Sequence, residues 1–238
     1  MDAAGDWAER LDHMEQWYRD LLASGTAEAF LHNDYAPHRA FLSGLHGRVI
    51  DVGGGAGVAG RYLPPSCTHV VVDPAAVWQD PAWKQFSASF AAGRSAEFVQ
   101  GTGEALPFAT AEFDAGLAFW SLNHAGDPAR CVAELARVVR PAGKVLLVLE
   151  DMEPTWGDCI LAALRRTGYR LGLPRKDHGG LGALPPVIRE KLSRNPWPLQ
   201  DDHCRIDERD LMRWAAPAFR LTRREWLGGF LAFEFVRR

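Results

Sequence analysis

The segment Arg48–Gly57 constrains the fold of this chain more than any other stretch. Its sequence, RVIDVGGGAG, has the pattern of a short buried strand that ends in the carboxylate of Asp51 and passes directly into a glycine-rich turn. Glycine permits positive φ and lets a ligand approach where a Cβ would clash. A helix that we expect to begin near Gly57 adds oriented N–H groups and partial positive charge. The segment therefore predicts a binding turn for a nucleotide-like ligand and leaves open which one.

Strand-like and helix-like patterns alternate through the first 150 residues. Further apolar runs predict strands at 68–73, 96–100, 113–120 and 144–150. Between the last two, residues 127–140 form the clearest helical pattern, with Asp127 as its cap and Pro128 in its first turn. Such alternation predicts right-handed crossovers and a parallel sheet.

The two ends of the chain add elements outside this alternation. Apolar residues at helical spacing between Trp7 and Leu22 predict an opening amphipathic helix, which is either packed support or a lid over the ligand. Near the other end, Asp207 is expected to cap a last helix. Two β-type runs, 219–227 and 230–236, then flank Gly228-Gly229 and predict a hairpin.

These patterns predict a single domain in four parts. They are an N-terminal helical cap (1–46), a cofactor-binding core (47–150), a helical insertion (151–205), and the last helix with the hairpin (206–238). The insertion mixes apolar residues with a basic run between Arg165 and Lys176, so we expect it to cover the pocket of an acceptor molecule. The basic run either favours an anionic acceptor or forms a solvated face.

Charge and composition narrow the class of protein. A net charge of −3 over 238 residues argues against a general nucleic-acid-binding surface. The N-terminus has no apolar signal run, and no stretch approaches the ~20 apolar residues of a membrane span. The four cysteines are scattered, which is typical of reduced thiols, and no metal-ligand set is evident. We therefore expect a cytoplasmic protein without a metal, which binds small molecules, and leave a homodimer open.

Residues 55–60 fit the pattern G-x-G-x-x-G, so a dinucleotide fold competes with other readings. Asp51 argues against that fold, because its charge would repel a pyrophosphate but would attract an ammonium or sulfonium. Asp73, at the tip of the second strand, could accept hydrogen bonds from both ribose hydroxyls of either kind of cofactor.

Four further motifs complete a family pattern in its usual order over residues 48–150. They are GTGEALPF at 101–108, Phe113-Asp114, SLNH at 121–124, and ELARVVRPAG at 134–143. With these motifs the chain resembles the class I S-adenosylmethionine-dependent methyltransferases, in the group that includes small-molecule and quinone methyltransferases. The resemblance implies a three-layer, Rossmann-like α/β fold with a seven-stranded, mostly parallel sheet that ends in the hairpin.

The resemblance also implies a set of cofactor-binding residues for S-adenosyl-L-methionine. The glycine loop would wrap the methionine part, Asp73 would hold the ribose, the segment after Gly101 would follow the adenine, and the end of the fourth strand would meet the ligand amine. The implied residues are Asp51, Gly53, Gly55, Gly57, Asp73, Pro74, Thr102, Gly103, Glu104, Ala118 and Phe119. Thr102 stands where relatives usually have an aspartate, and a hydroxyl should bind the adenine amine less strongly.

Methyl transfer chiefly requires that the nucleophile is held in line with the sulfur and the methyl group of the cofactor. A base is required only if the nucleophile is protonated. The ends of the fourth and fifth strands would face the methyl group. There, His124 is the best general-base candidate because its ordinary pKa lies near neutrality, and Glu150 is the second. Turn and helix-cap roles remain the structural alternatives for these two residues.

The function that we expect is methyl transfer from S-adenosylmethionine to an oxygen, nitrogen or carbon of a small metabolite, in bacterial biosynthesis. Two alternatives stay open. One is a catalytically silent scaffold subunit that binds the cofactor, and the other is an NAD(P)-dependent oxidoreductase. Acceptor identity does not follow from the fold.

Overall fold

The computed structural model describes residues 3–91, 93–150, 156–157, 160, 204 and 206–238, with side chains described from residue 11 onward. Nearly all of the expected insertion, and the acceptor cover predicted for it, lie outside the described residues.

The described helices are α1 (Ala3–Ala23), α2 (Ala27–Tyr35), α3 (Arg39–Leu42), α4 (Pro81–Phe90), α5 (Pro128–Val138) and α8 (Glu208–Ala215). The strands are β1 (Arg48–Val52), β2 (Thr68–Asp73), β3 (Glu97–Gln100), β4 (Phe113–Phe119), β5 (Val139–Leu149), β6 (Phe219–Leu227) and β7 (Phe230–Arg237). Short 3₁₀ turns are η1 (Ala36–His38), η2 (Val58–Arg61), η3 (Ala76–Gln79) and η4 (Leu122–His124). None of the described helices combines the length and apolar content that a bilayer span requires.

The seven strands form one sheet in the order β3-β2-β1-β4-β5-β7-β6. The first five strands pair in parallel, whereas β7 pairs antiparallel with both β5 and β6. This confirms the predicted mostly parallel sheet with a closing hairpin. Strand order reverses between β1 and β4, and in open α/β sheets ligands bind outside the carboxyl ends of the strands at such a point.

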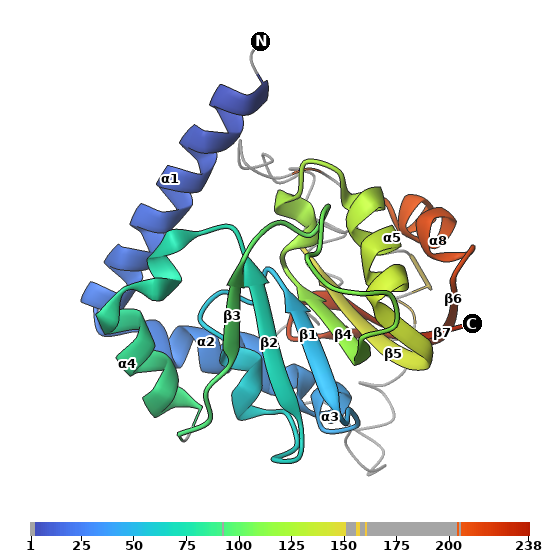
Figure 1. The fold of residues 1–238 in the computed structure, drawn as a ribbon, viewed down its shortest axis with the longest axis horizontal. Helices are drawn as coiled ribbons and strands as arrows, with labels where there is room; N and C mark the ends of the chain where they lie inside the picture. Colours follow the sequence, from blue (N-terminus) through green and yellow to red (C-terminus); the bar gives the residue numbers. More distant parts are fainter. Residues whose placement is uncertain (1–2, 92, 151–155, 158–159, 161–203, 205) are drawn as a thin grey trace.

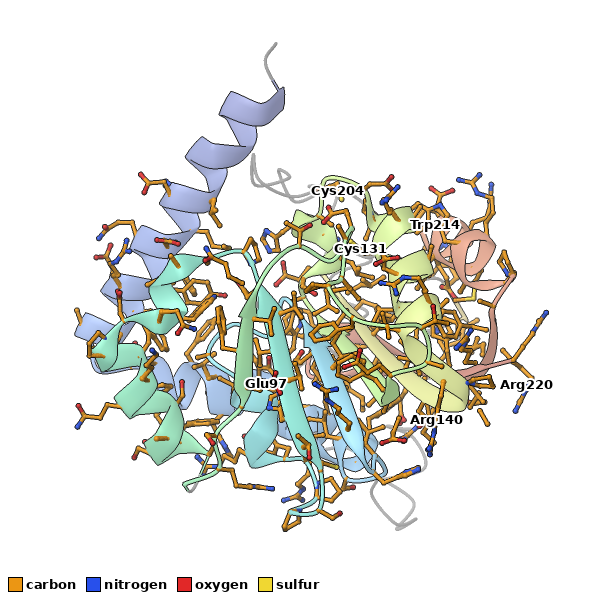
Figure 2. All side chains as sticks on the ribbon, viewed as in Figure 1. Glu97, Cys131, Arg140, Cys204, Trp214 and Arg220 are labelled. Carbon is orange, nitrogen blue, oxygen red and sulfur yellow. The ribbon has the colours of Figure 1, made fainter. Side chains whose placement is uncertain are left out.

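Helices cover both faces of the sheet, which gives the expected three layers (Figure 1). Along β1, Ile50 and Val52 pack in the core beneath α5 and α8, whereas Val49 packs in the core with α2 and α4, as the alternation of side chains along a strand requires. The α5–α8 layer also contains Cys131 and Cys204, which Figure 2 labels.

Local signals set several boundaries where the sequence placed them. The carboxylate of Asp127 accepts a hydrogen bond from the backbone N–H of Arg130 at 3.0 Å and caps α5. Asp207 caps α8 in the same way, through the N–H of Arg209 at 2.7 Å. In the hairpin, Gly228 and Gly229 both have positive φ, the conformation for which two-residue turns select glycine.

Two predicted boundaries were wrong. The helix expected to begin near Gly57 is only the four-residue turn η2, and the residues that follow it include Pro64 and Pro65, which lack the backbone N–H that a helix needs. The helix expected to reach Arg140 ends at Val138, because Val139 instead pairs with Phe113 of β4 and begins β5.

Candidate functional site

A cavity of about 960 Å³ opens at the carboxyl ends of the strands. Its walls come from α1, α2, the loop after β1, the ends of β2, β4 and β5, segment 102–104, and the β6–β7 turn. This is the location that the reversal of strand order between β1 and β4 predicts for a ligand. The volume lies within the range of small-molecule and cofactor sites, ~300–1,000 Å³.

The glycine loop forms one wall of this cavity. Gly53 and Gly55 both have positive φ, at 69° and 54°, where a Cβ would strain the backbone. A Cβ on Gly53 would lie 2.2 Å from Cβ of Ser121, and the Oγ of Ser121 donates a hydrogen bond to the carbonyl of Val52 at 2.6 Å. Glycine at position 53 therefore lets the end of β4 approach the loop closely.

Asp73 connects the tip of β2 to this loop. Its Oδ2 accepts a hydrogen bond from the backbone N–H of Gly55 at 3.0 Å, and its Oδ1 accepts one from Ala75 at 2.9 Å. Burial raises the pKa of Asp73 to about 6, against the lowering effect of these two N–H groups. Each carboxylate oxygen keeps a further lone pair for a ligand hydroxyl.

Most of the residues implied by the family resemblance line the cavity, and three do not. Those in the lining are Gly53, Gly55, Asp73, Pro74, Thr102, Gly103, Glu104 and Phe119. Asp51, Gly57 and Ala118 are buried outside the lining, since Gly57 packs on Ala96 and Val71 and Ala118 belongs to the core beneath α5.

Asp51, which the resemblance implies as a cofactor-binding residue, is buried in β1 and lies outside the cavity lining. Its Oδ2 atom lies 3.0 Å from Nε2 of His69 on the neighbouring strand β2, and both side chains are buried. A Cβ on Gly54 would lie 2.4 Å from the Asp51 carboxyl carbon, so the carboxylate packs directly against the loop backbone. Asp51 therefore supports the loop through Oδ2, while its Oδ1 has no hydrogen-bond partner among the described residues.

The two predicted catalytic residues lie close together on the cavity wall. Nε2 of His124, in η4, is 3.9 Å from Oε2 of Glu150 at the end of β5, and both side chains are partly exposed. The neighbouring Asn123 is fully buried and exchanges hydrogen bonds with the backbone of Glu150, at 3.1 Å to its N–H and 3.2 Å to its carbonyl. Asn123 thus holds Glu150 in place and does not itself face the cavity.

The sequence did not identify Asp34, which is half-buried in α2 and lines the cavity. Burial raises the pKa of Asp34 to about 6. Tyr35 lines the cavity beside it and packs on Phe119 and Trp120, with ring centroids 5.7 and 4.9 Å away. No motif or spacing marks Asp34, because its position depends on how α2 packs over the strand ends.

Trp17 and Tyr18 of α1 also line the cavity, so this helix borders the site as well as packing on the domain. Tyr18 packs against Trp78 and Trp83, with ring centroids 4.4 and 6.1 Å away. Among the described residues, no group of three or more His, Cys, Asp or Glu side chains could hold a metal ion.

Comparison with known proteins agrees with this geometry. Residues 50–147 match a family described as a methyltransferase domain. A methyltransferase of Mycolicibacterium gilvum is 35% identical over 196 residues, which cover 79% of this chain and 71% of that protein. Demethylmenaquinone methyltransferase of Renibacterium salmoninarum is 35% identical over 118 residues, or 44% of each chain. The crystal structure of Bacillus subtilis YcgJ aligns with a TM-score of 0.56 at 18% identity, and the alignment covers 87% of this chain and 99% of YcgJ.

The chain therefore belongs to the class I S-adenosylmethionine-dependent methyltransferases, and its fold is their Rossmann-like fold. It spans less than half the length of the demethylmenaquinone methyltransferase that it matches.

Proposed function

We propose that this chain binds S-adenosylmethionine in the 960 Å³ cavity and transfers its methyl group to a small-molecule acceptor, as a cytoplasmic enzyme of bacterial biosynthesis. One observation carries the proposal: the glycine loop and Asp73 together form one wall of a cavity whose other walls are aromatic. A cofactor on the first wall leaves room for an acceptor beside the second.

The residues of the first wall suit this cofactor. Asp73 would bind the ribose hydroxyls, the loop 53–56 would border the methionine part, and segment 102–104 would follow the adenine. The described cavity lining contains four carboxylates and neither Lys nor Arg. Such a lining favours a sulfonium and disfavours the pyrophosphate of a dinucleotide, which argues against the oxidoreductase alternative.

When bound, the cofactor supplies a methyl group on a sulfonium that leaves readily as a thioether. The chain must then orient the acceptor and, for a protonated nucleophile, take up its proton. We assign that role to His124, since it lies on the cavity wall with the Glu150 carboxylate 3.9 Å away, which would stabilise an imidazolium.

Calorimetric titration with S-adenosylhomocysteine and with NADH tests the cofactor. We expect saturable binding of S-adenosylhomocysteine only. The Asp73→Asn variant should lose charge-assisted hydrogen bonds of about 1.5–3 kcal/mol, an affinity loss on the order of 10- to 100-fold.

Asp80→Asn is the matched control, because Asp80 is a partly exposed carboxylate outside the cavity lining, 3.7 Å from Arg19. It should bind S-adenosylhomocysteine as the wild type does. NADH binding by the wild type, or unchanged affinity in Asp73→Asn, would contradict the proposal.

A further inference from the structure

The four carboxylates of the cavity lining differ in what they contact. Asp73 accepts the N–H groups of Gly55 and Ala75. Glu104 accepts those of Gly126 and Asp127, at 2.9 and 3.2 Å, where α5 begins. Glu150 lies beside His124. The remaining carboxylate, Asp34, makes no hydrogen bond or ion pair within the described part of the chain.

The described lining of the cavity offers Asp34 no Lys or Arg side chain. Burial is the main cause that raises the pKa of the Tyr18 and Tyr35 phenols, and the charge of Asp34 adds to it, so both phenols remain neutral. Glu150 and Asp73 contribute to the same effect on Tyr18. A half-buried carboxylate in such surroundings is stabilised most by a cation.

Six aromatic side chains line the same cavity as Asp34. They are Trp17, Tyr18, Phe30, Tyr35, Trp120 and Phe230. These rings include two groups in direct contact. Trp17 packs on Phe30, with ring centroids 5.6 Å apart. Trp120 packs on both Tyr35 and Phe230, with ring centroids 4.9 and 5.3 Å away. Ring faces attract cations, and ring surfaces bury apolar groups.

We propose that the acceptor is an amine that is protonated at neutral pH and carries an apolar or aromatic body, and that Asp34 binds its ammonium group among these aromatic side chains. The inference rests on the proposed function and names the acceptor class for the same site. S-adenosylmethionine does not use up the negative charge, because its own carboxylate offsets one of its two cationic groups. An anionic acceptor, which the basic run of residues 165–176 suggested, would meet like charges at Asp34 and Glu150.

The test uses three probes with one aromatic body and different charge: phenethylamine, 2-phenylethanol and phenylacetate. Each is titrated by calorimetry at pH 7.5 into protein saturated with S-adenosylhomocysteine. We expect phenethylamine to bind most tightly, 2-phenylethanol more weakly, and phenylacetate least.

Asp34→Asn should weaken phenethylamine binding on the order of 10- to 100-fold, the loss of one hydrogen-bonded charge pair, while the affinity for 2-phenylethanol stays unchanged. The control is Glu28→Gln, also in α2, whose exposed carboxylate lies 3.5 Å from Arg61 and outside the cavity lining. It should leave all three affinities unchanged.

Three results would overturn the proposal while leaving the proposed function intact. They are phenylacetate binding as tightly as phenethylamine, no phenethylamine binding at all, and equal weakening of the amine and the alcohol in Asp34→Asn. A fourth, weaker S-adenosylhomocysteine binding in Asp34→Asn, would assign Asp34 to the cofactor and overturn the proposal as well. Failure of the wild type to bind S-adenosylhomocysteine would instead contradict the proposed function.

Discussion

The carboxylate of Asp51 in β1 is hydrogen-bonded to the imidazole of His69 in β2, with 3.0 Å between Oδ2 and Nε2, directly against the glycine loop. Only 1% of Asp51 and 7% of His69 is exposed. The His69 ring also lies close to η2, the turn that follows the loop, since a Cβ on Gly60 would lie 3.2 Å from its Nδ1. The pair therefore supports the loop that forms the cofactor wall.

Removal of the histidine should destabilise the fold. His69→Ala leaves the buried Asp51 carboxylate without its hydrogen-bond partner, and an unsatisfied buried acceptor typically costs about 1–3 kcal/mol. Urea denaturation at pH 7.5 measures the free energy of unfolding. His46→Ala, at an exposed histidine, should change stability by less than about 0.5 kcal/mol. A loss in His69→Ala no larger than in this control would mean that the pair contributes little.

Substitution of Gly54 should displace the cofactor wall. The added Cβ of Gly54→Ala would lie 2.4 Å from the Asp51 carboxyl carbon, so the loop must shift, at a cost of about 1–3 kcal/mol. We expect weaker S-adenosylhomocysteine binding by calorimetry. In the control Gly44→Ala, the Cβ meets nothing closer than 3.5 Å, and affinity should be unchanged. Wild-type affinity in Gly54→Ala would show that the loop yields without consequence for the cofactor.

The His124–Glu150 pair should affect turnover and not cofactor binding. For an acceptor that must lose a proton, His124→Ala should lower kcat about 10²–10⁴-fold, the usual loss for a general base. Affinity for S-adenosylhomocysteine should stay the same, and so should kcat in His46→Ala. If Glu150 acts through the imidazole, Glu150→Gln should add little to His124→Ala in a double-mutant cycle. A kcat for His124→Ala within a few-fold of wild type would remove His124 from the chemistry.

Asp34 should reduce stability at neutral pH, which follows from the sign of its pKa shift. Burial raises its pKa from 3.8 to about 6, so between these values the folded state binds more protons at this group than the unfolded state. The free energy of unfolding is therefore unaffected by Asp34 below about pH 4. It falls as pH rises, and the loss is complete once the pH has passed about 6.

Asp34→Asn removes this dependence, because an amide does not titrate. At pH 7.5 the variant should be more stable than wild type by about 1–2 kcal/mol, a value reduced from the full shift because Asp34 is partly exposed. Near pH 4 the two should have equal free energies of unfolding in urea. Glu28→Gln should show no such divergence from wild type. A difference between Asp34→Asn and wild type that does not change with pH would contradict the assignment.

The elements of the core were predictable because their signals are local. Apolar runs marked the strands, Asp127 and Asp207 marked two helix starts, and Gly228-Gly229 marked the hairpin. Each of these depends on a few adjacent residues that restrict backbone conformation. Motifs in a fixed order then indicated the family, which the comparison with the Mycolicibacterium gilvum protein shows.

Long-range pairing decided what these signals could not. The helix before β5 ends at Val138 because β4, whose pairing residue Phe113 lies 26 positions earlier in the chain, recruits Val139 into the sheet. The glycine-rich motif correctly indicated a binding loop, yet the side-chain direction of Asp51 was set by His69 on the adjacent strand.

The sequence by itself determined the strands, two helix caps, the hairpin turn and the family to which the chain belongs. Each of these features depends on residues that are neighbours in the chain. Only the tertiary structure decided which side chains face the cavity. Asp34 reaches it because α2 packs its Tyr35 on Phe119 and Trp120 at the end of β4. Asp51 lies outside the lining, where its Oδ2 is hydrogen-bonded to the buried His69 of β2. In each case the physical reason is a contact between residues far apart in the chain, which no local pattern encodes.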